Sequence, residues 1–106
     1  LSIRPENLCY DYEVRGEEFP WRPIRAFDDG QKTYIQMPPE MRVNEAPALF
    51  LVEEDEEPAL LNYRVWRNFY IVDRLFEEAE LRVGPHKRVT ITTMKKKPSF
   101  FERLFG

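Results

Sequence analysis

The chain is divided into short runs of apolar or alternating residues, separated by turn signals at intervals of about 8–14 residues. In residues 8–14, "LCYDYEV", apolar and aromatic side chains alternate with Cys9, Asp11 and Glu13. Residues 88–94, "RVTITTM", alternate in the same way. A period of two is typical of half-buried strands, whereas an amphipathic helix shows a period near 3.6. The segmentation therefore favours an antiparallel sandwich or barrel of short strands.

Five further runs are predicted to form strands, at residues 23–27, 32–37, 48–52, 60–66 and 69–73. The run "ALFLV" is continuously apolar, so we expect both of its faces to be covered. The last two runs are predicted to pair as a hairpin around Arg67 and Asn68, with Asn68 in the left-handed conformation. The ambiguous stretch that follows is interpreted as a helical turn at Leu75–Ala79 and a strand at Glu80–Val83.

The stretch "AFDDGQKTYIQMP" (26–38) places two carboxylates, Asp28 and Asp29, directly before Gly30. A calcium loop of the EF-hand type needs oxygen ligands at alternating positions and a glutamate at its twelfth position. That spacing is not met here, and Lys32 would repel a cation. A turn explains the same residues, because aspartate side chains cap turns and glycine supplies a positive φ. We therefore expect a hairpin turn rather than a metal site.

The residues that could carry catalysis are few. His86 is the single histidine and Cys9 the single cysteine, so a zinc site within the chain is not expected. A nucleophile pair of Cys9 and His86 is disfavoured, because Asp11 and Glu13 share the strand face of Cys9 and oppose a thiolate. The acidic run 53–57 is typical of a solvated turn. We expect a binding module without enzymatic activity, metal or cofactor.

Charge is distributed unevenly along the 106 residues, which are enough for one domain. Residues 1–85 carry 10 Lys and Arg against 18 Asp and Glu, whereas residues 86–106 carry 6 against 1. The acidic body argues against nucleic-acid binding. We divide the chain into a β-rich body, residues 1–94, and a basic, Phe-rich tail, residues 95–106. Ser99 and Glu102 in the tail match a capping box, which predicts a short C-terminal helix. The lysines and phenylalanines of the tail fit either docking on a neighbour or contact with a membrane surface.

Several stretches occur together in a characteristic order, namely "YDYEVRG", "WRPIRAFDDGQKTYIQMP", "APALFLV" and "LNYRVWRNFYIVDRLFEEAELRVG", with a closing "VTI". This order, which covers residues 8 to 92, resembles the C-terminal domain of the TrbG/CagX family. That family is the outer-membrane-side core-complex subunit of type IV secretion and conjugation systems, the ninth product of the VirB operon. The resemblance implies an antiparallel β-sandwich of about 7–9 short strands. The chain, which begins at Leu1, is then expected to be an excised domain.

The resemblance also implies a structural role in the bacterial periplasm, in association with the outer membrane. The implied partners are a short outer-membrane lipoprotein (the seventh VirB-type product), a TrbI-like scaffold subunit (the tenth) and neighbouring copies in a ring. Such a ring would form a channel for the transfer of DNA or protein. Direct contact with nucleic acid is not expected.

We expect the lipoprotein to lie along the sandwich as an extended segment that adds backbone hydrogen bonds at an open sheet edge. The residues predicted to bind it are Cys9, Tyr10, Asp11, Tyr12, Glu13 and Trp21. The residues predicted to contact ring neighbours are Arg64, Trp66 and Tyr70. The alternative hypothesis is a carbohydrate-binding β-sandwich that uses exposed tryptophan and tyrosine side chains.

Overall fold

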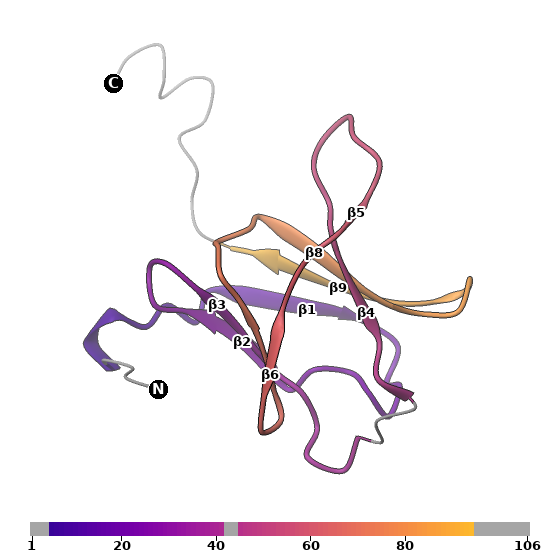
Figure 1. Ribbon diagram of the computed structural model, residues 1–106, viewed down its shortest axis with the longest axis horizontal. Helices are drawn as coiled ribbons and strands as arrows, with labels where there is room; N and C mark the ends of the chain where they lie inside the picture. Colours follow the sequence, from indigo (N-terminus) through magenta and orange to yellow (C-terminus); the bar gives the residue numbers. More distant parts are fainter. Residues whose placement is uncertain (1–4, 42–44, 95–106) are drawn as a thin grey trace.

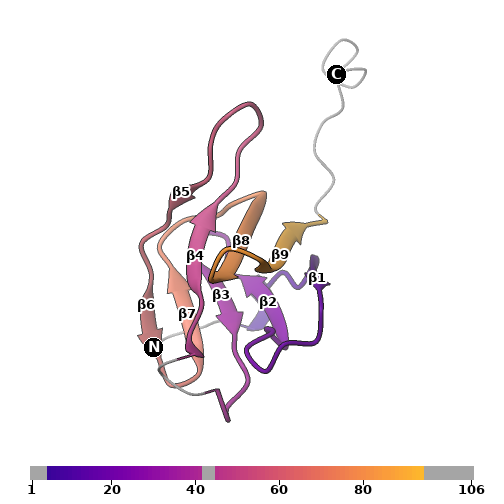
Figure 2. The ribbon, with the colours of Figure 1, turned by 90° about the vertical axis from the view of Figure 1, so that its right-hand side faces the viewer.

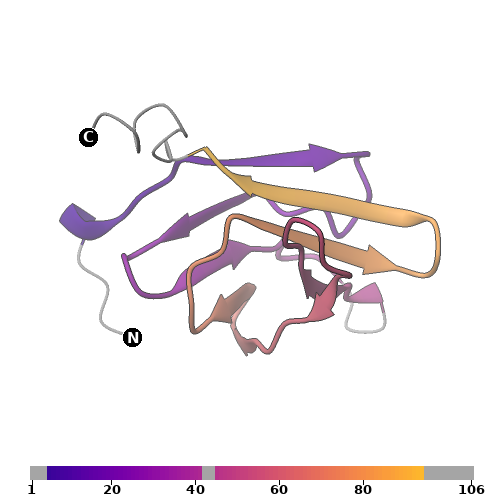
Figure 3. The same ribbon diagram turned by 90° about the horizontal axis from the view of Figure 1, so that it is seen from above.

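Two antiparallel sheets lie face to face in the computed structural model, which describes residues 5–41 and 45–94 (Figure 1). The described elements are the 3-10 turn η1 (Pro5–Asn7) and the strands β1 (Tyr12–Gly16), β2 (Arg25–Asp28), β3 (Thr33–Gln36), β4 (Ala48–Leu51), β5 (Ala59–Leu60), β6 (Arg64–Trp66), β7 (Phe69–Val72), β8 (Glu78–Val83) and β9 (Lys87–Thr93). One sheet has the order β1-β9-β8-β4-β5 and the other β2-β3-β7-β6 (Figure 3). The predicted β-sandwich is confirmed. The predicted C-terminal helix lies outside the described residues.

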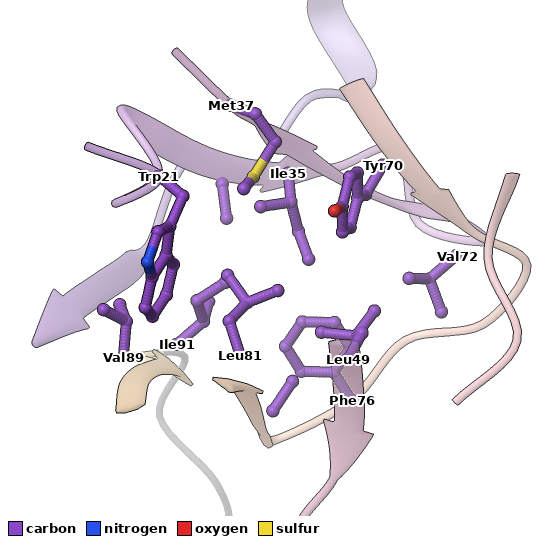
Figure 4. Close-up of a cluster of buried hydrophobic side chains, with 12 residues drawn as sticks. Trp21, Ile35, Met37, Leu49, Tyr70, Val72, Phe76, Leu81, Val89 and Ile91 are labelled. Atoms are coloured by element: carbon purple, nitrogen blue, oxygen red, sulfur yellow. The ribbon is translucent and has the colours of Figure 1, made fainter. Parts of the chain in front are cut away.

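The main core fills the space between the two sheets (Figure 4). Every second residue of a strand points inward, as the alternation in the sequence predicts. In β8 the inward residues are Ala79 and Leu81, and in β9 they are Val89 and Ile91, all fully buried. The other buried members of this cluster are Trp21, Ala26, Ile35, Met37, Leu49, Tyr70, Val72 and Phe76.

A second, smaller cluster lies on the opposite face of the four-stranded sheet. Phe27, Tyr34 and Ile71 are buried there, with Leu8 and Phe69 packed against them. The ring of Phe27 stacks on that of Tyr34 at a centroid distance of 5.2 Å. The segment that leads into β1 supplies Leu8, so it covers part of this outer face. This sheet is therefore apolar on both faces, which explains the uninterrupted burial of Thr33, Tyr34 and Ile35 in β3.

The first strand begins later than the sequence predicted. The predicted strand at 8–14 is observed as β1, Tyr12–Gly16, paired with β9. Cys9 instead forms an isolated bridge with Asp28 of β2, through backbone hydrogen bonds of 2.8 and 2.9 Å. The Tyr12 amide donates to the Tyr10 carbonyl at 2.7 Å. This tight turn lets the chain pass from the four-stranded sheet to the five-stranded sheet. The alternation in residues 8–14 continues through the turn, so the sequence does not indicate the change of sheet.

The predicted strand at 60–66 is likewise divided between the two sheets. Residues Ala59–Leu60 pair with β4 in the five-stranded sheet, whereas Arg64–Trp66 pair with β7 in the four-stranded sheet. Between them the Leu61 amide donates to the Leu49 carbonyl at 3.0 Å. Strands that switch sheets form the corners of a sandwich, and this corner carries the chain from β5 to β6 (Figure 2).

Two further local predictions are wrong. The helical turn at Leu75–Ala79 is absent from the described structure, and β8 already begins at Glu78. The positive φ of the β6–β7 hairpin, 55°, belongs to Arg67 rather than Asn68. Asn68 instead donates its side-chain amide to the Met37 carbonyl at 2.7 Å, so its role is to hold β3 against this turn.

β4 is covered on one face only, contrary to the expectation from its continuous apolar run. Leu49 is fully buried, whereas Ala48 is exposed and Phe50 is half-buried. The guanidinium of Arg82 lies 4.6 Å from the centroid of the Phe50 ring. A charged side chain therefore covers the outward aromatic ring, through a cation–π contact.

The turn predicted from "DDG" is confirmed. Gly30 has a φ of 91°. Oδ1 of Asp28 accepts the Gly30 amide at 2.8 Å, and Oδ1 of Asp29 accepts the amides of Gln31 and Lys32 at 2.9 and 2.7 Å. The two carboxylates thus satisfy backbone donors of the turn and set the register of β2 against β3.

Candidate partner-binding edges

β1 is an outermost strand of the five-stranded sheet, at the position where the sequence predicted an open edge. The Met94 amide donates to the Asp11 carbonyl at 2.6 Å, which directs the backbone of Asp11 toward β9. Backbone groups alternate in direction along an antiparallel strand. Those of Tyr12, Val14 and Gly16 are therefore turned away from β9. We call this row of backbone groups the β1 edge.

A loop side chain covers part of the β1 edge. The guanidinium of Arg22 donates to the Val14 carbonyl at 2.9 Å and to Glu18 at 3.0 Å. Its Nε is buried and has no hydrogen-bond partner in the described structure. Sequence reasoning did not identify Arg22, because nothing in the local sequence distinguishes it from the other arginines of the chain. A bound strand at this edge would displace Arg22 from Val14.

Four of the six predicted lipoprotein-binding residues fall into three environments, and a fifth, Tyr12, is half-buried with its hydroxyl bonded to Asp28. Tyr10 and Asp11 are exposed, and the Tyr10 ring lies 5.2 Å from that of Phe27. Cys9 is half-buried in its bridge to β2. Glu13 forms two hydrogen bonds with the guanidinium of Arg15, at 2.8 and 2.9 Å. The Glu13 carboxylate is therefore already paired with Arg15 within the chain.

Trp21 is a core residue, so its side chain does not form the surface anchor that the sequence suggested. It is only 3% exposed, and its ring stacks on that of Phe19 at 4.9 Å. Figure 4 shows it beside Val89 and close to Met37, at one end of the main core. Its contribution to any partner site is to support the loop that carries Arg22.

The second edge lies at β6, an outermost strand of the four-stranded sheet. The Asn68 carbonyl accepts the Met37 amide at 2.7 Å, toward β3. Alternation then directs the backbone of Phe69 toward Trp66, its partner in β6. The backbone groups of Val65 are therefore turned out of the sheet. We call this strand and its exposed side chains the β6 edge.

The β6 edge is rich in exposed apolar side chains. Val65 is 65% exposed, Trp66 43%, and Leu60 in the neighbouring β5 75%. Tyr63 is also exposed, and its ring stacks on Tyr70 at a centroid distance of 4.3 Å. Val65, Leu60 and Tyr63 were not singled out from the sequence, because a strand at 60–66 was expected to bury half of its side chains.

The three residues predicted to contact ring neighbours are not equivalent. Arg64 is exposed and donates to Asp73 at 2.9 Å. Trp66 is exposed with the Arg67 guanidinium 4.9 Å from its ring centroid. Tyr70 is buried, and its hydroxyl donates to the Pro47 carbonyl at 3.0 Å. Burial raises the pKa of Tyr70 well above its usual range. Arg64 and Trp66 are therefore available at the surface, whereas Tyr70 is a core residue.

The residues that could hold a metal ion, or pair as nucleophile and base, are dispersed in the described structure. No cluster of three or more His, Cys, Asp or Glu side chains suited to a metal ion occurs within 5–41 and 45–94. His86 lies in the β8–β9 turn, at the opposite end of the molecule from the segment of Cys9 (Figures 1 and 3). Within the same ranges, the structure holds no helix with the length and apolar character that a membrane crossing requires.

The fold and these edges define a class of protein, an antiparallel β-sandwich with exposed aromatic side chains beside its outermost strands. The model of the CagX family, described as conjugal transfer protein, matches residues 2–94. The chain therefore belongs to the TrbG/CagX family of type IV secretion, and the predicted resemblance is confirmed.

Two curated relatives illustrate the relationship. The chain is 34% identical over 92 residues to a probable conjugal transfer protein TrbG of Sinorhizobium fredii, a match that covers 87% of the chain and 33% of the relative. It is 29% identical over 83 residues to the type IV secretion system protein virB9 of Brucella abortus biovar 1, covering 76% of the chain and 28% of the relative. The chain thus spans about a third of the length of these relatives.

Proposed function

We propose that this chain is the lipoprotein-binding domain of a structural subunit in a type IV secretion core complex, located in the periplasm at the outer membrane. A short lipoprotein contributes an extended segment that pairs with the β1 edge. A TrbI-like scaffold subunit and neighbouring copies of the chain complete a channel ring for DNA or protein. Membership of the TrbG/CagX family supports this role.

The observation that carries the proposal is the presence of an outermost strand with outward backbone groups in each sheet. The β1 edge belongs to the five-stranded sheet and the β6 edge to the four-stranded sheet. Main-chain hydrogen bonds at such an edge provide affinity for an extended peptide. The β6 edge is then left to meet a different surface of a neighbouring copy, and head-to-tail contacts of this kind form a ring when the rotation between copies closes.

The two edges are assigned different partners. We place the lipoprotein at the β1 edge, where Tyr10 and Asp11 are exposed beside the strand. We place the neighbouring copy at the β6 edge, where Val65, Trp66 and Leu60 expose apolar surface. Exposed apolar patches rimmed by polar residues mark interaction sites.

A proline substitution at each edge tests the assignment. Val14→Pro and Val65→Pro each remove an amide that is turned away from the neighbouring strand, so each sheet should keep its own hydrogen bonds. Amide shifts of labelled protein would be followed during titration with a synthetic peptide of the cognate lipoprotein. We expect Val14→Pro to weaken binding at least about tenfold, which corresponds to about 1.4 kcal/mol, and Val65→Pro to leave it unchanged.

Each variant serves as the matched control of the other, and circular dichroism would verify that both are folded. The reverse pattern, with binding lost only in Val65→Pro, would move the lipoprotein to the β6 edge. An absence of peptide binding to the unmodified chain would overturn the capture mechanism itself.

A further inference from the structure

A groove lined by apolar and acidic side chains lies between the β4–β5 loop and the segment that precedes β8. Its main hollow has a volume of about 560 Å³, and a smaller hollow of about 290 Å³ adjoins it. Val52, Glu53, Glu54, Glu77 and Thr93 line both, so the two hollows form one continuous feature. We call it the acidic groove.

The chemistry of the acidic groove suits a segment that is both basic and apolar. Its apolar lining includes Leu51, Leu75 and Phe76. Its charged lining consists of Glu53, Glu54, Glu77, Glu78 and Arg74, a formal charge of −3. Arg74 lies 3.8 Å from Glu53, so the one lining cation already has an acidic neighbour.

The acids of the β4–β5 loop are crowded. A hydrogen bond and charge repulsion from Glu53 raise the pKa of the Glu56 carboxyl, although Glu56 is fully exposed. Such like-charge crowding is relieved when a cation binds nearby. The groove therefore combines an apolar lining with lining side chains of net negative formal charge, next to a loop that is itself acidic.

The segment 95–106, "KKKPSFFERLFG", has the complementary composition. Lys95, Lys96, Lys97 and Arg103 against Glu102 give it a formal charge of +3. Phe100, Phe101, Leu104 and Phe105 add four large apolar side chains. We propose that the acidic groove binds this segment of its own chain, with the lysines at the lining glutamates and phenylalanine side chains against the apolar lining.

The position of β9 favours binding within one molecule. Thr93 lines the groove, and its amide donates to the Glu77 carbonyl at 2.7 Å. Met94 is held by its own amide, which donates to Asp11. The segment therefore starts two residues from the groove wall. A connection this short gives an effective concentration in the millimolar range, which a neighbouring molecule in dilute solution does not match. This inference does not depend on where the lipoprotein binds.

A nitroxide spin label tests the proposal directly. Gly106→Cys in a Cys9→Ser background places the label at the end of the segment. We expect the amide signals of residues 51–54 and 75–78 to be broadened strongly, and those of the β8–β9 turn to be unaffected. A second sample mixes spin-labelled protein of natural isotope abundance with isotope-enriched protein that carries no spin label. Only the enriched protein is observed in this mixture, and the broadening of its signals should disappear. Persistent broadening in the mixture would overturn binding within one molecule.

Charge reversal supplies a second readout that does not rely on the label. The amide shifts of the groove in the full chain should differ from those of a chain ending at Met94. The double variant Glu53→Lys, Glu54→Lys should abolish that difference between the full and shortened chains. Adding Lys95→Glu and Lys96→Glu to this double variant should restore the difference at least in part. Glu40→Lys with Glu45→Lys, which reverses two exposed acids outside the groove, should leave it intact. Identical groove shifts in the full and shortened chains would refute the proposal.

Discussion

The hydroxyl of Tyr12 donates a 2.7 Å hydrogen bond to Oδ2 of Asp28, and this bond joins the two sheets of the sandwich. Asp28 is 1% exposed, and its other carboxylate oxygen accepts the amide of Gly30 in the β2–β3 turn. One carboxylate therefore holds both a turn and an inter-sheet contact. Burial, together with the hydrogen bond and the charge of Asp28, raises the pKa of Tyr12 well above its usual range.

Removal of this hydroxyl should destabilise the fold. Tyr12→Phe keeps the ring but leaves a buried carboxylate oxygen without this donor, and loss of a hydrogen bond to a charged group costs about 1.5–3 kcal/mol. Urea unfolding would measure the change. Tyr10→Phe is the matched control, because Tyr10 is exposed and its ring contact with Phe27 is retained. A similar loss in both variants would show that the Tyr12–Asp28 bond is not the cause.

Asp29 should make the stability of the turn dependent on pH. Burial raises the pKa of its carboxyl, but hydrogen bonds from the amides of Lys32 and Gln31 and from the Tyr34 hydroxyl outweigh burial and lower it. In the unfolded chain an aspartate carboxyl has a pKa near 3.9, so the lower pKa of Asp29 in the folded state stabilises the fold at pH values above about 3.9. That stability is lost as pH falls through the folded pKa. Asp29→Asn should therefore unfold more easily than the unmodified chain at pH 7.

The difference between the two proteins should close below about pH 4, as measured by thermal unfolding across a pH series. Glu40→Gln, at an exposed carboxyl outside the turn, should follow the unmodified chain throughout. A difference between Asp29→Asn and the unmodified chain that stays constant from pH 7 to about pH 3 would show that the carboxylate charge is not responsible.

Gly16 should tolerate a side chain poorly. Its φ is 139°, and a Cβ built there would lie 2.9 Å from the Arg88 carbonyl oxygen of β9. Gly16→Ala should therefore cost about 1–3 kcal/mol through backbone strain, with a further loss from the close contact. Gly84→Ala is the comparison, because φ is 67° there but the space around it is open. Equal losses of unfolding free energy in the two variants would exclude the close contact as a cause.

The sequence predicted the parts of this structure that local chemistry determines. The "DDG" turn depends on side chains that bond amides two and three residues away, so its residues carry the whole signal. The alternation in β9 likewise shows directly in the burial of Val89 and Ile91. The division of 60–66 between sheets depends instead on which strand, β4 or β7, is available to pair. That information lies in the tertiary arrangement and not in the run itself.

The candidate edges were predictable only in part, for a similar reason. An outermost first strand was expected, and β1 occupies that position. Tryptophan in a loop is compatible with both a core and a surface position, so the burial of Trp21 required the structure. Arg22 could not be predicted either, because its contact with Val14 joins a loop side chain to a strand carbonyl eight residues away. The apolar exposure of Val65 became visible only once β6 was placed at an edge.

The two tryptophans provide a final test, because the structure gives them opposite roles. Trp21 is buried in the main core, whereas Trp66 is exposed beside Arg67 at the β6 edge. Truncation of a core tryptophan costs about 3–5 kcal/mol, whereas surface substitutions usually stay within about 0.5 kcal/mol. Trp21→Ala should therefore lower the unfolding free energy severely, and Trp66→Ala should change it little.

Fluorescence separates the same residues without loss of the fold. In Trp66→Phe the remaining emission comes from Trp21 and should be blue-shifted and resistant to acrylamide, whereas Trp21→Phe should leave emission that acrylamide quenches readily. If neighbouring copies meet at the β6 edge, assembly of the subunit should protect Trp66 from acrylamide while Trp21 stays unchanged. Quenching of Trp66 that is the same before and after assembly would place the contact between copies elsewhere on the sandwich.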